Sequence, residues 1–270
     1  MGQIERVMKD HNVGRSTGVS LLVDGLNATL VFDRPARRNA LNFADWKEIA
    51  RLIGTLDTLA IRTLTVRGAG TDFCAGADIA EFETARAAGE PAKAYEAANE
   101  AAFAAIRNVP VPTIAAIDGV CIGGGFGIAA ACDIRLATLD ARFSVPAGRI
   151  GLAYPVKAMA DIVSALGRTR ATALLMNASQ RDSAIMLRWG FVTEVVADLA
   201  AAVEQWREAI TQLAPLSLAA SKAAILGHAN RDLSAIERAK QIGAQTFKSA
   251  DYKEGVAAFN ARRAPVFRGS

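Results

Sequence analysis

Two short segments of the sequence, FCAGAD at 73–78 and IDGVCIGGGFG at 117–127, have the composition needed to bind a developing negative charge. Each ends an apolar, β-branched run and leads into an alanine-rich helical pattern, so each offers nearly bare backbone N–H groups at a strand-to-helix turn. Helix N-termini favour negative charge, and paired N–H groups can hold an oxygen that gains charge during a reaction. Two such turns facing each other would form an oxyanion hole.

The glycine run also has other interpretations. The pattern Gly125-x-Gly127-x-x-Ala130 fits a relaxed dinucleotide-binding fingerprint, but the sequence about 20 residues later supplies no acidic partner for a ribose at a strand end. A phosphate-binding P-loop would need a following Gly-Lys-Ser or Gly-Lys-Thr, which the sequence lacks. Glycines and alanines also allow helices to pack closely without any chemistry, and the run alone does not decide between these alternatives.

The composition is typical of a folded globular protein. Of the 270 residues, 51% are hydrophobic and 21% are charged, which is enough for a sizeable core. The formal net charge of +4 is too small to indicate a nucleic acid partner. No segment has the length and apolarity of a membrane span, and the N-terminus lacks the apolar region of a signal peptide. We therefore expect a cytoplasmic protein with neither a nucleic acid nor a membrane partner.

The cysteines and histidines do not have the spacing of a chemical site. Cys74, Cys121 and Cys132 lie in apolar surroundings and are typical of buried thiols in a reducing compartment. The two histidines, His11 and His228, are remote in sequence from the glycine turns. A His-based triad or a metal site is therefore not expected.

Hydrophobic periodicity predicts alternating strands and helices, followed by a long series of helices. A turn signal at Asp24-Gly25 separates strands at 18–24 and 28–32, and Asn42 can cap a helix that continues to about residue 58. Further strands are expected at 61–66, 113–117 and 134–137, with helices at 79–107, broken near 89–91, and at 124–132. Beyond residue 155, helices are expected at 156–166, 168–177, 182–189, 199–213, 215–227, 232–247 and 251–261, with one short strand at 192–196.

This order predicts an α/β protein in three parts. Residues 1–16 are expected to be a flexible tail, 17–197 an α/β core that holds the site, and 198–270 a helical C-terminal region. Alternating strands and helices favour right-handed crossovers, with sites at the carboxyl ends of the strands. The helix at 124–132 is too apolar to lie anywhere but in the interior.

The order and spacing of the motifs resemble the crotonase superfamily, also called the enoyl-CoA hydratase/isomerase superfamily. The resemblance covers about residues 18–268. It rests on DRP at 33–35, NALN at 39–42, FCAGADI at 73–79, PTIAAIDG at 112–119, GGG at 123–125, ACDI at 131–134, IGL at 150–152, WGFV at 189–192, DYKEG at 251–255 and RAPVF at 263–267.

The resemblance implies a fold, a substrate class and an assembly. The fold would be a spiral of ββα turns with a helical C-terminal region used in trimer formation, so a homotrimer or a dimer of trimers is expected. The substrate would be an acyl-CoA thioester, with coenzyme A as part of the substrate and no separate cofactor. The backbone N–H groups of Ala77 and Gly124 would hold the thioester carbonyl oxygen, in agreement with the interpretation of the two turns.

The resemblance also implies which residues contact the substrate. Arg37 and Arg38 follow the DRP turn, where the family meets the nucleotide of coenzyme A. Lys253 and the pair Arg262 and Arg263 would contribute from a neighbouring subunit. The full set of substrate-binding positions is Arg37, Arg38, Ala40, Ala75, Asp78, Ile79, Val120, Gly123, Pro146, Phe247 and Lys253.

The sequence departs from the family where hydratases carry their two glutamates. Those positions are occupied by Gly127, just after the glycine run, and by Ala147, after the proline of the FSVP segment. Hydration uses paired carboxylates because water must be activated while a proton is delivered to carbon. Hydration by two glutamates is therefore not expected here.

Tyr154 is the most suggestive replacement, because the decarboxylase branch of the superfamily carries a tyrosine near this place. Loss of CO₂ generates the enolate directly and needs no strong base. Asp78 is a carboxylate near the site, although the family uses it to cap the following helix, and Glu81 and Ser144 are further polar candidates. We therefore expect an acyl-CoA lyase or isomerase that acts through a thioester enolate, with a decarboxylase or C–C lyase that uses Tyr154 as the leading mechanism. Tyr154 could instead only line the wall of the pocket. The alternatives are an isomerase with an unidentified base and a catalytically silent protein that binds CoA esters.

Overall fold

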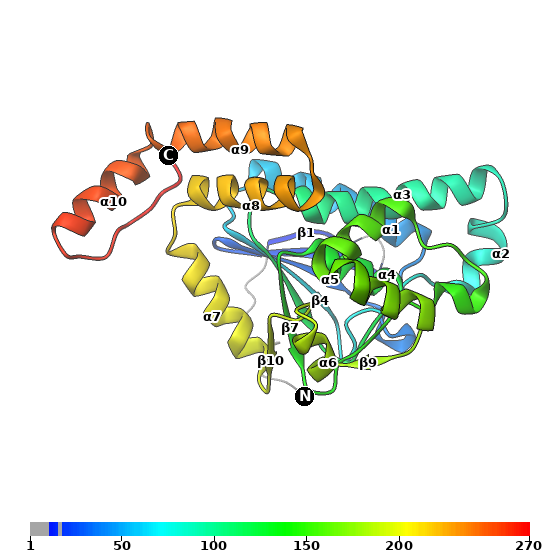
Figure 1. Ribbon diagram of the computed structural model, residues 1–270. Coiled ribbons are helices and arrows are strands. Elements are labelled where there is room, and N and C mark those ends of the chain that lie inside the picture. Colours follow the sequence, from blue (N-terminus) through cyan, green and yellow to red (C-terminus); the bar gives the residue numbers. More distant parts are fainter. Residues whose placement is uncertain (1–10, 16–17) are drawn as a thin grey trace.

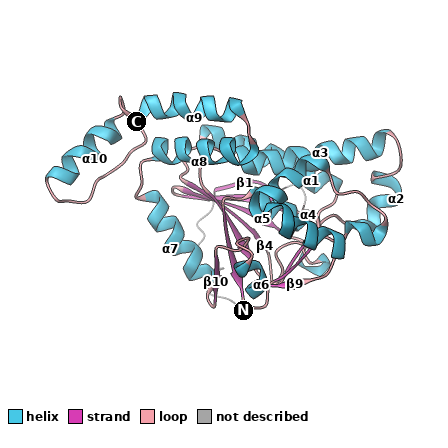
Figure 2. Cartoon of the chain, viewed as in Figure 1, coloured by secondary structure: helices cyan, strands magenta, loops and turns pink. Residues whose placement is uncertain are grey.

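The structure, a computed structural model, describes residues 11–15 and 18–270. Within these residues a seven-stranded sheet has the order β1-β2-β3-β4-β5-β7-β10, and a smaller sheet has the order β6-β8-β9. Helices surround the larger sheet (Figure 1), and Figure 2 shows its strands gathered at the centre of the molecule. The strands are β1 (His11–Arg15), β2 (Val19–Asp24), β3 (Asn27–Phe32), β4 (Thr63–Gly68), β5 (Thr113–Ile117), β6 (Val120–Ile122), β7 (Ile134–Thr138), β8 (Arg142–Ser144), β9 (Arg181–Asp182) and β10 (Glu194–Val196).

The helices lie between the strands and after them. They are α1 (Phe43–Gly54), α2 (Phe82–Ala85), α3 (Glu90–Asn108), α4 (Gly124–Ala131), α5 (Val156–Asn177), α6 (Ser183–Arg188), α7 (Leu199–Thr211), α8 (Pro215–Asn230), α9 (Leu233–Thr246) and α10 (Ala250–Asn260). The predicted order of elements is confirmed in nearly every case. The two helices expected on either side of residue 167 are also present, because the backbone of Gly167 leaves the helical region inside α5.

The main sheet begins with the predicted hairpin and then becomes parallel. β2 and β3 pair antiparallel around the turn, whereas β3, β4, β5, β7 and β10 pair in parallel. Parallel neighbours require crossover connections, which α1, α3, α4 and, between β7 and β10, α5 and α6 provide. The segments β5-β6-α4 and β7-β8-α5 each run in the order strand, strand, helix. This arrangement confirms an α/β core and places the predicted turns at the carboxyl ends of β4 and β5.

The helices nearest the site are fixed by local sequence. In α1 the Asn42 side chain accepts a hydrogen bond from Asp45 N–H at 2.8 Å, and the Asp45 carboxylate accepts one from Asn42 N–H at 3.0 Å. This capping box fixes the start of the helix, and the buried face of α1 carries Trp46 and Ile49. In α4, every residue after Gly124 is buried. The prediction of an interior helix at this position is therefore confirmed.

Four strands were not predicted. β6, β8 and β9 have two or three residues each, which is too short for a period-two pattern to be recognised. β1 lies inside the predicted tail of residues 1–16: His11–Arg15 pair antiparallel with β2, with a register shift between Asn12 and Gly14. The prediction of a flexible tail is therefore wrong for these five residues, because the edge of β2 offers them backbone hydrogen bonds. The rest of that predicted tail lies outside the described residues.

The C-terminal helices form an arm that extends from the sheet. α8 and α9 pack against each other as a hairpin, and α10 projects beyond them (Figure 1). Here we call residues 233–270, which hold α9 and α10, the C-terminal arm. Its large apolar side chains are exposed to an unusual degree, reaching 85% at Phe259, 79% at Leu233 and 68% at Phe247. The predicted helical C-terminal region is confirmed.

Among the described residues, no single helix is long and apolar enough to cross a membrane. α7 and α8 meet the length and composition of a span only when taken together, and they are bent by 109° relative to each other.

Candidate active site

The two glycine turns are joined by short strand pairing. Cys74 and Cys121 form an isolated parallel bridge. Cys74 N–H donates to Val120 O at 2.9 Å, and Ile122 N–H donates to Cys74 O at 3.0 Å. The segment after β4 and the segment before α4 therefore lie side by side, as an oxyanion hole requires.

Gly76 and Gly124 allow the turns to approach each other closely. A Cβ on Gly76, whose φ is +92°, would lie 2.9 Å from the Gly124 nitrogen and 2.7 Å from the Ile122 oxygen. A Cβ on Gly124 would lie 3.6 Å from the Ala77 nitrogen. Only glycine fits at residue 76, both for space and for its left-handed backbone. These distances place the backbone nitrogens of Ala77 and Gly124 near each other at the start of α4.

Both of these N–H groups are unused in the described part of the chain. Leu41 N–H donates to Gly76 O, and Asp78 N–H donates to Leu41 O. This parallel bridge uses the groups on either side of Ala77 and leaves the Ala77 N–H without a partner among the described residues. Gly124 is the first residue of α4, where an N–H has no partner within the helix. Both residues are half-buried, whereas Gly76 and Gly125 are buried. Two accessible donors at a helix N-terminus can bind an oxygen that acquires negative charge.

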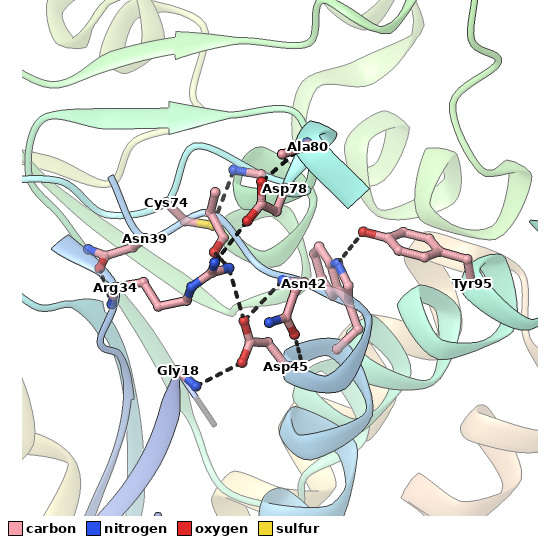
Figure 3. Close-up of polar contacts among 12 residues, drawn as sticks. Gly18, Arg34, Asn39, Asn42, Asp45, Cys74, Asp78, Ala80 and Tyr95 are labelled. Carbon is pink, nitrogen blue, oxygen red and sulfur yellow. Dashed lines mark hydrogen bonds and ion pairs between the residues drawn. The ribbon is translucent and has the colours of Figure 1, made fainter. Parts of the chain in front are cut away.

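Trp46 of α1 forms a wall beside this pair of donors, which the sequence analysis did not predict. A Cβ on Gly124 would lie 2.8 Å from the edge of the Trp46 ring. The ring packs edge-to-face on Phe103 of α3. Its Nε1–H donates to the hydroxyl of Tyr95, which is labelled in Figure 3, at 3.2 Å. The helical spacing of Trp46 indicated a core residue, and no sequence signal connects it with residue 124.

The first position at which the resemblance expects a glutamate is filled by other side chains. A Cβ on Gly127 would overlap the Tyr154 hydroxyl and would lie 3.0 Å from Cζ of Phe103. The Tyr154 hydroxyl in turn donates to the carbonyl oxygen of Gly123 at 3.1 Å. Burial raises the pKa of the Tyr154 hydroxyl well above its usual range, with a smaller contribution from neighbouring acidic groups led by Cys121. Tyr154 is therefore a neutral hydrogen-bond donor at the first turn of α4.

Ala147, at the second position where the resemblance predicts a glutamate, lies beside an apolar cavity. Ala147 begins a short 3₁₀ turn, Ala147–Ile150, after Pro146. A cavity of about 370 Å³ extends from Ala147 and Tyr154 toward α5, and no carboxylate lines it. The remaining lining is Val145, Gly148, Leu152, Met159, Val163, Arg168, Ala171, Thr172, Leu175 and Met176.

Asp78 is held by an arginine and by a cap. Its carboxylate lies 2.8 Å from Nη2 of Arg34 and accepts a hydrogen bond from Ala80 N–H at 3.3 Å (Figure 3). Arg34 also contacts the fully buried carboxylate of Asp45 at 3.4 Å and donates to the Ala40 carbonyl at 2.8 Å. The expected capping role of Asp78 is confirmed. Its ion pair with Arg34 joins the first glycine turn to the start of α1.

Glu81 is a half-buried carboxyl group one turn further along the chain. Burial raises its pKa, and the charge of Asp78 acts in the same direction, whereas a hydrogen bond from the backbone of Phe43 and one with Tyr95 lower it. The Oε1 atom of Glu81 is buried and has no hydrogen-bond partner among the described residues. Ser144 lies on the other side of the glycine run, where its carbonyl accepts from Gly123 N–H at 2.9 Å.

The loop expected to meet coenzyme A lies against the first glycine turn. Ala75 N–H donates to the Arg38 carbonyl at 2.9 Å, which places this loop beside the first glycine turn. Arg37 and Arg38 are exposed, as a pair of cations that binds phosphate groups would be. Ala75, Asp78, Val120 and Gly123 are part of the two turns, Ile79 directly follows the first turn, and Arg37, Arg38 and Ala40 lie in the loop that is hydrogen-bonded to it. Pro146 lies two residues after β8, which pairs with β6 of the second turn.

Two of the expected substrate-binding residues are not near the turns of their own chain. Phe247 directly follows α9 and Lys253 lies in α10, which projects away from α4 (Figure 1). Phe247 is 68% exposed and stacks edge-to-face with Tyr252 of the same arm. Within one chain, the structure therefore does not bring these two residues to the site.

The cysteines are buried and free. Burial raises the pKa of the Cys74 and Cys132 thiols to about 12 and that of Cys121 well above its usual value. Thiols with such pKa values carry almost no thiolate near neutral pH and are poor nucleophiles. In the described residues, no cluster of three or more metal-ligating side chains occurs.

Comparison with known proteins gives the class to which this site belongs. The chain matches the family model for enoyl-CoA hydratase/isomerase over residues 27–270. The protein therefore belongs to the enoyl-CoA hydratase/isomerase family, which lies within the crotonase superfamily.

Individual relatives cover nearly the whole chain. The mevalonyl-coenzyme A hydratase sidH of Aspergillus fumigatus is 32% identical over 255 residues, which cover 89% of this chain and 91% of that protein. A Mycobacterium tuberculosis protein named "Probable enoyl-CoA hydratase echA6" is 32% identical over 246 residues, covering 90% of this chain and 96% of that protein. The solved structure of an enoyl-CoA hydratase/carnithine racemase from Magnetospirillum magneticum has a TM-score of 0.90 and 34% identity, covering 96% of this chain and 99% of that one. The crotonase-like fold expected from the sequence is confirmed.

Proposed function

We propose that this protein processes an acyl-CoA thioester through an enolate whose oxygen is held by the backbone N–H groups of Ala77 and Gly124. The observation that supports this proposal is the convergence of two unused N–H groups where Gly76 meets Gly124. Membership of the enoyl-CoA hydratase/isomerase family supports an acyl-CoA substrate. Removing one donor from a preorganised pair of this kind typically costs about 3 kcal/mol of transition-state stabilisation.

Within this class we propose a decarboxylase or C–C lyase. In decarboxylation of an α-carboxyacyl thioester, the bond between the α-carbon and the carboxyl carbon breaks and CO₂ leaves. The electron pair of that bond moves into the thioester, so that the carbonyl oxygen becomes the enolate oxygen held by the two N–H groups. A proton from water then adds to the α-carbon, and the carbonyl is restored.

The surroundings of the site support a reaction that does not need a pair of carboxylates. Gly127 is packed under Tyr154 and Phe103, and Ala147 borders an apolar cavity. Asp78, the carboxylate within the first turn, is ion-paired with Arg34. Glu81, with its raised pKa, is the group that supports an isomerase as a second candidate, because such a carboxyl could carry a proton between carbons.

We also propose that a second copy of this chain covers the C-terminal arm in a homotrimer or a dimer of trimers. The exposure of Phe247, Phe259 and Leu233 supports this, because large apolar side chains clustered on one arm are typical of an interface. The arm of a neighbour would then bring Lys253 and Phe247 to the coenzyme A bound at Arg37 and Arg38. The mass of the assembly in solution tests this, and a monomer would contradict it.

Incubation of the protein with methylmalonyl-CoA and, separately, with crotonyl-CoA tests the proposed reaction. We expect release of CO₂ from the first thioester and no rapid loss of the enone absorbance of the second. Rapid hydration of crotonyl-CoA would contradict the proposal. Isomerisation of an enoyl-CoA that is lost in Glu81→Gln would favour the second candidate, and binding of CoA esters without any turnover would indicate a silent binding protein.

A further inference from the structure

We infer that Tyr154 is a positioning residue of the oxyanion hole, acting through the peptide group that joins Gly123 to Gly124. This inference rests on the proposed function of the site. The carbonyl of Gly123 and the N–H of Gly124 belong to the same planar peptide unit. The Tyr154 hydroxyl donates to that carbonyl at 3.1 Å, so it contacts the opposite end of the group whose N–H faces the substrate oxygen.

This peptide group needs an anchor because the residue before it is conformationally free. Gly123 has φ +55° and ψ −114°, a conformation that residues with side chains rarely adopt. In the described part of the chain, no atom beyond its two chain neighbours lies within 4 Å of where its Cβ would be. Rotation of the 123–124 peptide would turn the Gly124 N–H away from the Ala77 N–H. The hydrogen bonds to the Gly123 carbonyl, from Tyr154 and from Gly127 N–H at 3.1 Å, oppose that rotation.

The hydrogen bond from Tyr154 to the Gly123 carbonyl also makes the Gly124 N–H a stronger donor. A carbonyl that accepts hydrogen bonds polarises its peptide unit, and the N–H of that unit becomes a better donor. Gly127 N–H supplies one such bond, as in any helix, and the tyrosine adds a second. Burial keeps the hydroxyl neutral and able to donate.

Gly127 has a specific place in this arrangement. Its missing side chain leaves the space that the Tyr154 hydroxyl occupies beside Phe103. The hydrogen bond from Tyr154 to the Gly123 carbonyl therefore forms only because residue 127 has no side chain. A glutamate at 127 is incompatible with this bond. Tyr154 then supports the oxyanion donor without touching the reacting carbon.

Nuclear magnetic resonance of glycine-labelled protein tests the bond itself. The sequence contains consecutive glycines only at 123–125, so labelling glycine with ¹⁵N and carbonyl ¹³C gives two linked nitrogen–carbonyl signals, Gly124 with Gly123 and Gly125 with Gly124. In Tyr154→Phe we expect the first signal to shift in both the Gly123 carbonyl and the Gly124 nitrogen, with the second signal less affected. Tyr252→Phe, which removes a hydroxyl on the C-terminal arm, serves as the matched control. An unmoved Gly124 signal in folded Tyr154→Phe would overturn the inference, whatever the substrate.

A ligand readout tests the consequence. Acetoacetyl-CoA has an enolate that absorbs in the near ultraviolet, so the bound enolate-to-keto ratio measures the strength of the oxyanion hole. We expect this ratio to fall about 3- to 10-fold in Tyr154→Phe, the equivalent of one neutral hydrogen bond, while butyryl-CoA still binds. An unchanged ratio would overturn the positioning role, as would loss of turnover with the ratio intact, since that would indicate direct proton donation. If the wild-type protein does not enrich the enolate at all, the proposed function fails, and the glycine signals still decide the inference.

Discussion

The hydroxyl of Tyr154 lies where the side chain of residue 127 would begin, because Gly127 has none. The two residues come from different elements, α4 and the loop before α5, and they meet at the first turn of the helix that carries the Gly124 donor. The space beside Gly127, the position at which the family resemblance predicts a glutamate, is therefore occupied by a hydroxyl that is hydrogen-bonded to the Gly123 carbonyl. This exchange is the structural reason to expect chemistry other than two-glutamate hydration.

Gly127→Ala is expected to destabilise the protein, because the new methyl group would displace the Tyr154 hydroxyl and press on Phe103. Overpacking of this kind costs about 1–3 kcal/mol. The loss should be smaller in a Tyr154→Leu background, which no longer places an atom there. Urea denaturation of the two single variants and the double variant measures the coupling.

Gly148→Ala is the control for this comparison of single and double variants. In the described part of the chain, no atom beyond its two chain neighbours lies within 4 Å of a Cβ at residue 148. This substitution should cost little in either background. Equal costs of Gly127→Ala with and without the tyrosine would contradict the packing described here.

Gly76→Ala is expected to separate the two donor turns. The residue has φ +92°, and its methyl group would meet the Gly124 nitrogen and the Ile122 oxygen. Strain at a left-handed position costs about 1–3 kcal/mol, and the structure can relieve it only by moving one turn. We expect lower thermal stability and loss of the bound enolate of acetoacetyl-CoA. A folded variant that still enriches the enolate as the wild type does would show that the two turns do not form the hole.

Asp78→Asn is expected to affect stability more than chemistry. The substitution keeps the size of the side chain and removes its ion pair with Arg34, leaving that guanidinium with the buried Asp45. Hydrogen bonds between charged groups contribute about 1.5–3 kcal/mol, so the free energy of unfolding should fall by an amount of that order. The enolate ratio of bound acetoacetyl-CoA should persist. A normal stability with turnover abolished would instead identify Asp78 as a catalytic group.

Glu81 predicts a specific dependence of stability on pH. Its pKa is raised in the folded protein, so between the ordinary value of 4.5 and the raised value the folded state binds more protons than the unfolded chain. Stability must therefore fall as pH rises through that range. Glu81→Gln lacks this titration, and the variant should gain stability relative to the wild type as the pH rises above 4.5. Urea denaturation at a series of pH values measures the difference, and parallel curves for the two proteins would contradict the raised pKa.

The parts of the site that could be predicted from the sequence are those fixed by neighbouring residues. The turns at 73–78 and 117–127 are predictable because a β-branched run, a few small residues and a helical pattern follow one another directly. The cap at Asn42 and the buried helix α4 follow from local pattern in the same way. Such features need no knowledge of the tertiary fold.

The rest depends on contacts between residues far apart in the chain. Trp46 reaches Gly124, and Arg34 reaches Asp78, only because the parallel sheet brings their elements together. Periodicity identified Trp46 as a core residue and could not say which glycine it would touch. The short strands β6 and β8 were missed because three residues are too few to show a pattern, although these strands hold the second glycine turn in place.

A crystal structure of the protein with bound butyryl-CoA tests the central claim most directly, through two distances. The thioester oxygen should lie about 2.7–3.1 Å from both the Ala77 nitrogen and the Gly124 nitrogen, as an oxyanion hole requires. A thioester bound with its oxygen away from either nitrogen, or a CoA ester bound elsewhere on the protein, would contradict the account.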